Sequence, residues 1–272
     1  MNRLDKILIE RGIVATRAKA QELIKSGNIK VNGKIVTKTS FDTSNNDIIE
    51  VLDTSTLKYV SRAGLKLEKA INTFSLDFNN KVVMDIGSST GGFTDCSLQN
   101  GSNKVIAVDV GTNLMHASLR NHPKVELHEQ TNIKDLPSDK FKGLDYITID
   151  VSFVSLSKIF EKLFSEQVNA EIIALIKPQF ECGKAIADKF KGVILNQKVH
   201  FDILNNVVSQ LNQYGYYLKD ITFSPITGGD GNIEYISHFT NKVATNTTFD
   251  FKKLISSAFE NHRKQPQKKV CI

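Results

Sequence analysis

The stretch "VVMDIGSSTGGFTD", residues 82–95, decides the fold of most of this chain. It starts as an apolar run, reaches an acid at Asp85, and breaks into a turn of small residues with three glycines. A strand, a glycine-rich turn and a helix in this order open many α/β sheets, and such a turn can hold a nucleotide. The G-x-G-x-x-G spacing of dinucleotide loops is absent, because Ser89 stands at the position of the second glycine.

Six more strand-like runs follow, with helical stretches between most of them. Apolar strands that alternate with helices predict an α/β fold, here a Rossmann-like and mostly parallel sheet that is covered on both faces. The last two strands, separated by "PITGGDGN", are expected to form an antiparallel hairpin at one edge of the sheet. The seven predicted strands span residues 81–87, 104–110, 124–129, 144–150, 171–177, 218–224 and 234–240.

The first 52 residues follow another pattern and predict a small α+β domain. Apolar spacing indicates one helix that stops at Gly12 and a second that starts after an N-cap at Thr16 and stops at Gly27. Asn32-Gly33 between apolar residues then indicates a tight β-hairpin. We therefore divide the chain into a domain at 1–52, a linker at 53–64, a second domain at 65–242, and a C-terminal helix with a basic tail at 243–272.

The composition limits the class of protein. The 272 residues have a formal net charge of +6, which favours an acidic partner such as nucleic acid, although a basic surface can also serve solubility alone. No run of about 20 apolar residues is present, and the first ten residues carry several charges, so neither a membrane span nor a secretory signal is expected. The three cysteines, Cys96, Cys182 and Cys271, lack C-x-x-C spacing, so we expect neither a zinc site nor a disulfide framework. This cysteine usage also predicts a cytoplasmic location.

The glycine loop favours one kind of nucleotide ligand. Asp109 ends the second strand about 20 residues after the loop, where an acid can bind the hydroxyls of a ribose. Asp85, followed by Ser88, Ser89 and Thr90, would attract a cation and repel a phosphate. S-adenosylmethionine has a ribose, an ammonium and a sulfonium but no phosphate, and it fits this pattern better than NAD. The alternative is an ordinary Gly/Ser-rich turn without a ligand.

Four charged residues lie where strands end or begin. Asp150 and Lys177 end the fourth and fifth predicted strands, Glu234 begins the last one, and Lys66 lies in a predicted helix before the first. A lysine at the end of an apolar strand needs a partner, and two lysines with two acids would satisfy one another. Each residue taken alone also fits a surface charge or a structural ion pair.

Several motifs together resemble one family. The stretches "SRAGLKLEKA", "DIGSSTGGFTDC", "VIAVDVG", "TIDVSFVSL", "LIKPQFE" and "SPITGGDGNIEYI" are similar to the TlyA family of ribosomal RNA ribose methyltransferases, often labelled haemolysin A. Residues 3–36 resemble the RNA-binding domain of ribosomal protein S-four, and the likeness covers residues 2–240 in the family's order. It implies an FtsJ-like 2′-O-methyltransferase with a Lys-Asp-Lys-Glu tetrad at Lys66, Asp150, Lys177 and Glu234.

The resemblance also implies roles for individual residues. Lys177 would take the proton of a ribose hydroxyl, Lys66 would assist as a second positive charge, and no metal would be needed. Asp150 would orient Lys177, and Glu234 would orient Lys66 or the ribose. The expected contacts to S-adenosylmethionine are Asp85, Gly87, Ser88, Ser89, Thr90, Gly91, Gly92, Phe93, Asp109 and Asn132. The expected RNA-binding residues are Arg3, Arg17, Lys19, Lys25, Lys30 and Lys34.

Some alternatives stay open at the level of sequence. Ser152, Phe153 and Ser155 can cap and pack the helix that follows them, or Phe153 can stack on a base. The expected partners are ribosomal RNA or ribosomal subunits, and members of the family methylate the ribose of cytidine. A non-catalytic RNA-binding or ribosome-assembly factor and, with less support, a haemolysin are the rival functions. The target nucleotide, the subunit and the oligomeric state do not follow from the sequence.

Overall fold

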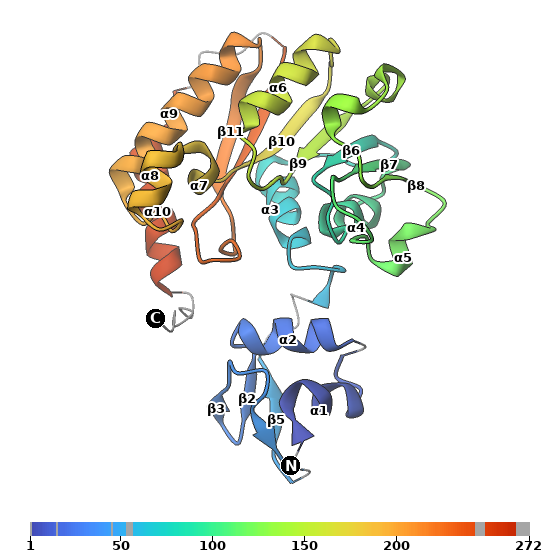
Figure 1. The fold of residues 1–272 in the computed structure, drawn as a ribbon, viewed down its shortest axis with the longest axis vertical. Helices are drawn as coiled ribbons and strands as arrows, with labels where there is room; N and C mark the ends of the chain where they lie inside the picture. The colour runs from blue at the N-terminus through green and yellow to red at the C-terminus, as the bar shows by residue number, and fades with distance from the viewer. Residues whose placement is uncertain (1, 15, 45, 53–56, 243–247, 265–272) are drawn as a thin grey trace. The chain divides into compact units, whose positions relative to one another are not determined.

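The computed structural model describes residues 2–14, 16–44, 46–52, 57–242 and 248–264. They form two compact units, residues 1–62 and 63–272, shown in Figure 1. Residues 53–56 of the predicted linker and residues 243–247 and 265–272 of the predicted C-terminal segment lie outside the described residues. The first helix of the second unit, α3, spans Gly64–Phe74.

The first unit has two helices and two small antiparallel sheets. The helices are α1 (Leu4–Glu10) and α2 (Arg17–Lys25). One sheet has the order β3-β2-β5, from β2 (Ile29–Val31), β3 (Lys34–Ile35) and β5 (Ile49–Val51), and the other pairs β1 (Asn2–Arg3) with β4 (Asp42–Thr43).

The predicted local signals of this unit are confirmed. The Thr16 hydroxyl caps α2 by accepting from the backbone N–H of Lys19 at 3.3 Å. Asn32 and Gly33 both have positive φ, 50° and 76°, as a type I′ hairpin turn requires.

The second unit is built on a seven-stranded sheet with the order β11-β12-β10-β9-β6-β7-β8. The five strands from β10 to β8 are parallel, and β12 runs antiparallel to both β10 and β11. All seven predicted strands are present, and the hairpin of the last two lies at a sheet edge as expected. The strands are β6 (Val82–Ile86), β7 (Lys104–Val108), β8 (Val125–His128), β9 (Tyr146–Ile149), β10 (Glu171–Ile176), β11 (Tyr217–Phe223) and β12 (Tyr235–Thr240).

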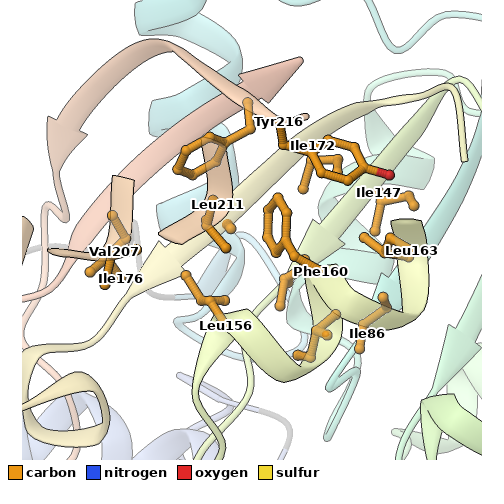
Figure 2. Packing of buried hydrophobic residues seen from close by; sticks show 14 of the residues in the cluster. Ile86, Ile147, Leu156, Phe160, Leu163, Ile172, Ile176, Val207, Leu211 and Tyr216 are labelled. Carbon is orange, nitrogen blue, oxygen red and sulfur yellow. The ribbon is translucent and has the colours of Figure 1, made fainter. Parts of the chain in front are cut away.

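Helices cover both faces of this sheet, as Figure 1 shows. One face packs against α6 and α9, and the other against α3 and α4. In the first of these layers, Phe160 of α6 meets Tyr216 edge to face, with ring centroids 5.1 Å apart (Figure 2). It meets Phe239 in the same way at 5.4 Å. The helices of this unit after α3 are α4 (Gly92–Gln99), α5 (Ala117–Arg120), α6 (Leu156–Ser165), α7 (Pro178–Glu181), α8 (Lys184–Lys189), α9 (Gln197–Gln213) and α10 (Phe251–Lys264). The unit also has the 3-10 turns η2 (Ile133–Asp135) and η3 (Ser138–Phe141).

The strand order fixes where a ligand can bind. After β8 the chain crosses back over the sheet to β9, which pairs with the free side of β6, so the strand order reverses between β6 and β9. Ligands of such sheets bind at the point of reversal, next to the loops that follow these two strands. At this point a Cβ on Gly87 would lie 2.7 Å from the backbone oxygen of Asp150. We call the side where the parallel strands end the carboxyl edge of the sheet.

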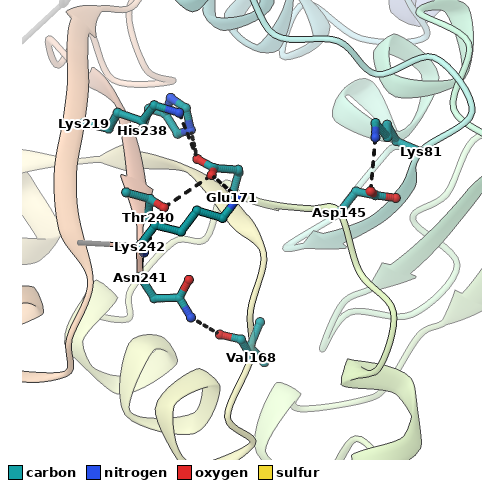
Figure 3. Close-up of polar contacts among 9 residues, drawn as sticks. All are labelled: Lys81, Asp145, Val168, Glu171, Lys219, His238, Thr240, Asn241 and Lys242. Carbon is teal, nitrogen blue, oxygen red and sulfur yellow. Dashed lines mark hydrogen bonds and ion pairs between the residues drawn. The ribbon is translucent and has the colours of Figure 1, made fainter. Parts of the chain in front are cut away.

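The opposite edge is closed by a polar network, shown in Figure 3. Glu171, the first residue of β10, lies 2.6 Å from Nε2 of the buried His238 on β12, and it also meets Lys219, Thr240 and Lys242. The His238 ring stacks on Phe74 at the end of α3. This edge is therefore occupied by its own side chains, and the first turn of α3 lies toward the carboxyl edge.

Candidate active site

Four charged side chains meet at the carboxyl edge. Lys66 comes from the first turn of α3, Asp150 and Lys177 directly follow β9 and β10, and Glu234 directly precedes β12. Lys66 Nζ lies 2.7 Å from Glu234 Oε2 and 3.4 Å from Asp150 Oδ2, and Lys177 Nζ lies 2.5 Å from Asp150 Oδ1. We call these four residues the tetrad. The structure thus brings together every residue that the sequence put forward as catalytic.

The tetrad is largely buried, so each charged side chain needs a partner of opposite charge. Its side chains are between 3 % and 13 % exposed. Burial disfavours the ammonium of Lys66, but the carboxylates of Asp150 and Glu234 outweigh it and raise the pKa of Lys66. Burial likewise disfavours the carboxylate of Asp150, but Lys66 and Lys177 outweigh it and lower the pKa of Asp150. Lys66 and Asp150 therefore keep their charges because their partners of opposite charge are present.

Asp150 separates the two lysines. One carboxylate oxygen faces Lys66 and the other faces Lys177, so the ammonium groups share a partner. The sequence suggested that Lys66 acts on Lys177 directly as a neighbouring positive charge. The geometry replaces that direct contact with a bridge through Asp150.

Glu234 is fixed tightly against its own loop. A Cβ on Gly228 would lie 2.6 Å from Glu234 Oε1, so the backbone of Gly228 packs against the oxygen that does not face Lys66. Any side chain at position 228 would have to displace this carboxylate.

The side chain of Asp85 is turned into the protein interior. Its carboxylate is completely buried and accepts hydrogen bonds from the hydroxyls of Thr94 at 2.7 Å and Thr148 at 3.0 Å. Burial raises its pKa to about 6, against the effect of these hydroxyls. The expectation that Asp85 contacts the ammonium of the cofactor therefore needs correction. The side chain points into the layer between the sheet and α4, where its hydrogen bonds stabilise the start of the glycine loop.

Asp109 fixes the glycine loop from the next strand. Its Oδ2 accepts from the N–H of Ser89 at 2.8 Å, and its Oδ1 accepts from the N–H of Gly111 at 2.7 Å. The side chain is only partly buried, and a carboxylate offers about four lone-pair sites, so both oxygens can still accept from a ribose. Ser89 itself has a φ of 47°, the left-handed conformation that this close turn demands.

The loop has the features that a nucleoside with a cationic side chain needs. The Ser88 hydroxyl is buried and has no hydrogen-bond partner among the described residues, so a ligand group could satisfy it. Val110 and Leu114 are 70 % and 40 % exposed beside Asp109, which suits the face of a purine. Residues 85–95 contain no lysine or arginine that would bind phosphate. These observations fit S-adenosylmethionine.

The remaining five predicted cofactor residues lie in three places: the glycine loop, the start of α4 and the start of η2. Thr90 accepts a hydrogen bond from His116 through its backbone oxygen, and Gly91 packs closely against Met115 and Leu119. Gly92 and Phe93 begin α4 and are buried. Asn132 is exposed and caps η2 by accepting from the N–H of Lys134.

Glu129 is a candidate that the sequence did not single out. Its carboxylate accepts from the backbone N–H groups of Asn113, Leu114 and Met115 and from the guanidinium of Arg120, all within 3.0 Å. The hydrogen bond from Met115, together with the other donors, outweighs burial and lowers the pKa of Glu129 to about 2. Glu129 thereby holds the loop that follows Asp109. Only the fold could reveal this role, because the donors lie 9–16 residues away in sequence.

Two phenylalanines, Phe153 in the loop after β9 and Phe180 in α7, lie side by side near Lys177. Phe153 is 88 % exposed, has a φ of 65°, and its ring centroid lies 4.9 Å from that of Phe180. An exposed aromatic residue in the left-handed region is strained, which is typical of functional sites. Ser155 caps α6, so the capping alternative is confirmed for Ser155, whereas Phe153 does not pack into the core.

Arg3 and Arg17 of the first unit share a structural partner. Asp5 is fully buried and receives hydrogen bonds from Arg3, Arg17 and Gln21 at 3.0–3.1 Å. Lys19 donates to the backbone oxygen of Leu57. Cations in the first turn of a helix are opposed by the helix dipole, and these contacts compensate Arg17 and Lys19 at the start of α2. Lys25 and Lys34 are exposed, and Lys30 is half-buried.

Comparisons with known proteins agree with this geometry. Residues 59–241 match the model of the FtsJ-like methyltransferase family, and residues 2–49 match that of the S4 domain. A candidate rRNA methyltransferase of Bacillus subtilis, YqxC, is 44% identical over 87% of this chain and 84% of its own length. The 23S rRNA (cytidine-2′-O)-methyltransferase TlyA of Campylobacter jejuni is 36% identical over 85% of this chain and 96% of its own.

A solved structure extends the likeness to the whole fold. A candidate hemolysin from Streptococcus thermophilus superposes with a TM-score of 0.75 and 34% identity, covering 96% of this chain and 97% of that one. Within the described part of the present chain, no helix is both long enough and apolar enough to cross a membrane.

Proposed function

The chain belongs to the FtsJ-like methyltransferase family, and from this premise we propose that it methylates the ribose 2′-hydroxyl of a cytidine in ribosomal RNA. The observation that carries the proposal is the tetrad of Lys66, Asp150, Lys177 and Glu234 beside the glycine loop. Enzymes of this fold depend on S-adenosylmethionine.

The cofactor would be held by the carboxyl-edge loops. When bound, S-adenosylmethionine supplies a methyl group on a positively charged sulfur, with a neutral thioether as the leaving group. Asp109 would accept hydrogen bonds from the ribose hydroxyls, and Val110 and Leu114 would contact the adenine. The unpartnered Ser88 hydroxyl would bind near the amino-acid end of the cofactor.

Lys177 is our candidate for the group that contacts the target hydroxyl and, in its neutral amine form, takes the proton of that hydroxyl. A ribose hydroxyl is a poor nucleophile until it loses its proton, so a positioned proton acceptor is needed. Lys177 Nζ is held between Asp150 and the hydroxyl of Ser152, 3.4 Å away, and its side chain is 8 % exposed. It lies at the end of β10, next to the loops that would hold the cofactor.

The other three members position Lys177. Asp150 fixes Nζ of Lys177 with one oxygen and Nζ of Lys66 with the other, and Glu234 anchors Lys66 from the far side. Correct positioning of two reactants can supply about 7–11 kcal/mol of the barrier reduction, so a rigid arrangement has catalytic value in itself. Phe153 would stack on the base of the target nucleotide.

The first unit supports RNA as the substrate. We propose that its S4 domain binds ribosomal RNA through exposed basic residues such as Lys25 and Lys34. The named activity of the Campylobacter jejuni relative supports cytidine as the target.

The deciding experiment is methyl transfer from labelled S-adenosylmethionine to unmethylated ribosomal RNA and subunits. We expect Lys177→Ala to bind cofactor and RNA as the wild type does but to lose transfer. Lys81→Ala is the matched control, because Lys81 pairs with Asp145 at the opposite edge of the sheet. Nuclease mapping of the methylated position reports whether the product is a 2′-O-methylcytidine. Near-normal turnover by Lys177→Ala would show that Lys177 does not take the proton.

A further inference from the structure

Two segments of the second unit are rich in positive charge that has no ion-pair partner among the described residues. Residues 183–198 contain four lysines and one acid, and residues 251–264 contain four lysines or arginines and one acid. Elsewhere in this unit many cations are paired, for example Lys104 with Glu126 and Lys219 with Glu171. Within the described residues, no ion pair involves any of these eight cations.

The loop before β12 makes hydrogen bonds to both segments. Asn232 is 1 % exposed, and its amide donates to the backbone oxygen of Gly192 at 2.8 Å and accepts from the N–H of Ile194 at 2.9 Å. The neighbouring Gly231 offers its backbone oxygen to Nε2 of His262, in the last turn of α10, at 3.1 Å. The chain after α8 and the basic end of α10 are therefore anchored by adjacent residues.

The same loop carries a member of the tetrad. Glu234 follows Asn232 by two residues, and Gly228 of this loop packs against its carboxylate. On the other side, α8 is joined through the short α7 to Lys177. The first basic segment thus follows Lys177 through α7, and the end of the second is bonded to the loop that leads to Glu234. Figure 1 shows α7, α8 and α10 at the same end of the second unit.

We propose that Lys184, Lys189, Lys191, Arg263 and Lys264, here called the α8–α10 surface, bind the phosphate backbone of the RNA next to the target nucleotide. All five side chains belong to exposed residues, so they can reach a ligand without breaking a contact between charges. Lysine and arginine that neutralise phosphates release counterions, which drives RNA binding. The proposal rests on the proposed RNA substrate, and it adds a second RNA contact to that of the S4 domain.

The alternative explanation is a solvated basic surface. Such a surface contributes little to binding any particular partner, and neutralising two of its charges would change RNA affinity no more than neutralising any other two exposed lysines. Salt dependence separates the two explanations, because only cations that contact phosphates change the slope of log K against log salt, by about 0.7–0.9 per contact.

The test uses the full-length chain and an unmethylated ribosomal RNA transcript. The variants are Arg263→Gln with Lys264→Gln, and Lys189→Gln with Lys191→Gln. The control is Lys124→Gln with Lys142→Gln, two exposed lysines that precede parallel strands and so lie at the opposite edge. We expect each test pair to lower the salt slope by about 1–2 and to weaken RNA binding, whereas the control keeps the wild-type slope. Turnover at saturating RNA should stay near wild type, because no tetrad residue is changed.

The possible failures are distinguishable. If the wild type binds and methylates the RNA but both test pairs keep its salt slope, the α8–α10 surface has no role in RNA binding. If the wild type itself neither binds nor methylates ribosomal RNA, the proposed function is wrong. Equal losses in the test pairs and in the control would also overturn the inference, because they would show a general effect of net charge.

Discussion

Glu181 on α7 holds the start of α6 with both oxygens of its carboxylate. Oε1 accepts from the backbone N–H of Leu156 at 2.8 Å, and Oε2 accepts from the hydroxyl of Ser155 at 2.7 Å. Burial raises the pKa of Glu181, although both hydrogen bonds oppose that rise. The contact locks the loop after β9, which carries Phe153, onto the segment after β10, which carries Lys177.

We expect Glu181→Ala to reduce methyl transfer roughly tenfold while leaving cofactor affinity unchanged. The variant loses two hydrogen bonds to a carboxylate, each of which contributes about 1.5–3 kcal/mol, and it releases the strained conformation of Phe153. Steady-state kinetics with RNA as the varied substrate measure the effect, and Glu181→Gln should recover part of it because an acceptor remains. Glu161→Ala on α6 is the control, since the one ion pair of Glu161 within the described part of the chain is with exposed Lys158. A Glu181→Ala enzyme with wild-type kcat and KM for RNA would rule out this positioning role.

Glu129→Gln should weaken cofactor binding without a comparable loss of turnover. The amide keeps one acceptor oxygen where the carboxylate receives four hydrogen bonds, so the loop after Asp109 loosens. We expect the KM for S-adenosylmethionine to rise about five- to tenfold, the size of one net hydrogen bond. Equilibrium binding of the cofactor checks this directly. An unchanged cofactor affinity would show that Glu129 serves only the local fold.

The buried Asp85 predicts a specific pH dependence of stability. Its pKa is about 6 in the folded chain against 3.8 ordinarily, so the folded state binds the proton more tightly than the unfolded state does. The contribution of Asp85 to stability is therefore greatest below pH 4 and is lost as the pH rises through 6. The loss is at most about 3 kcal/mol, at 1.36 kcal/mol per pKa unit.

Asp85→Asn removes this titration and tests its origin. Urea unfolding of wild type and variant at pH 4.5 and pH 7.5 gives four free energies of unfolding. The wild type should lose more stability than the variant between the two pH values. Parallel pH profiles would mean that Asp85 titrates normally despite its burial.

Asp5→Asn should destabilise the first unit. Asp5 has its pKa lowered by the hydrogen bond from Arg3, which outweighs burial, and by those from Gln21 and Arg17. Stability from this group is present above the ordinary pKa near 3.8 and is lost as the pH falls, and the neutral amide mimics that loss at pH 7. Hydrogen exchange should show faster exchange in α1 and α2 of the variant. Exchange at the wild-type rate would show that the arginines do not stabilise this unit.

Much of the site could be predicted because strand ends converge. Asp109, Asp150 and Lys177 directly follow parallel strands, and the carboxyl ends of such strands meet at one edge whatever the loops do. Asp85 was misplaced for a related reason. Strand β6 continues to Ile86, so Asp85 is still a sheet residue and alternates with Met84 and Ile86 to face α4.

Other features depend on contacts that no local pattern contains. Glu129 and Glu181 act on backbone N–H groups of other segments, and a carboxylate in a loop has no sequence signal for that. The pairing of Arg17 with Asp5, twelve residues away in sequence, is likewise indicated by no local pattern. In each case the missing information was which segments the tertiary fold places next to one another.

The charge balance of the tetrad has a consequence for how substrate reaches it. Two lysines and two acids cancel, and each cation already has a carboxylate partner, so the reactive centre exerts little long-range pull on a polyanion. Capture of the substrate and the chemistry performed on it must therefore be divided between different parts of the molecule. Such a division allows either one to change without the other: basic residues outside the tetrad can be exchanged to suit a different RNA while the tetrad stays as it is.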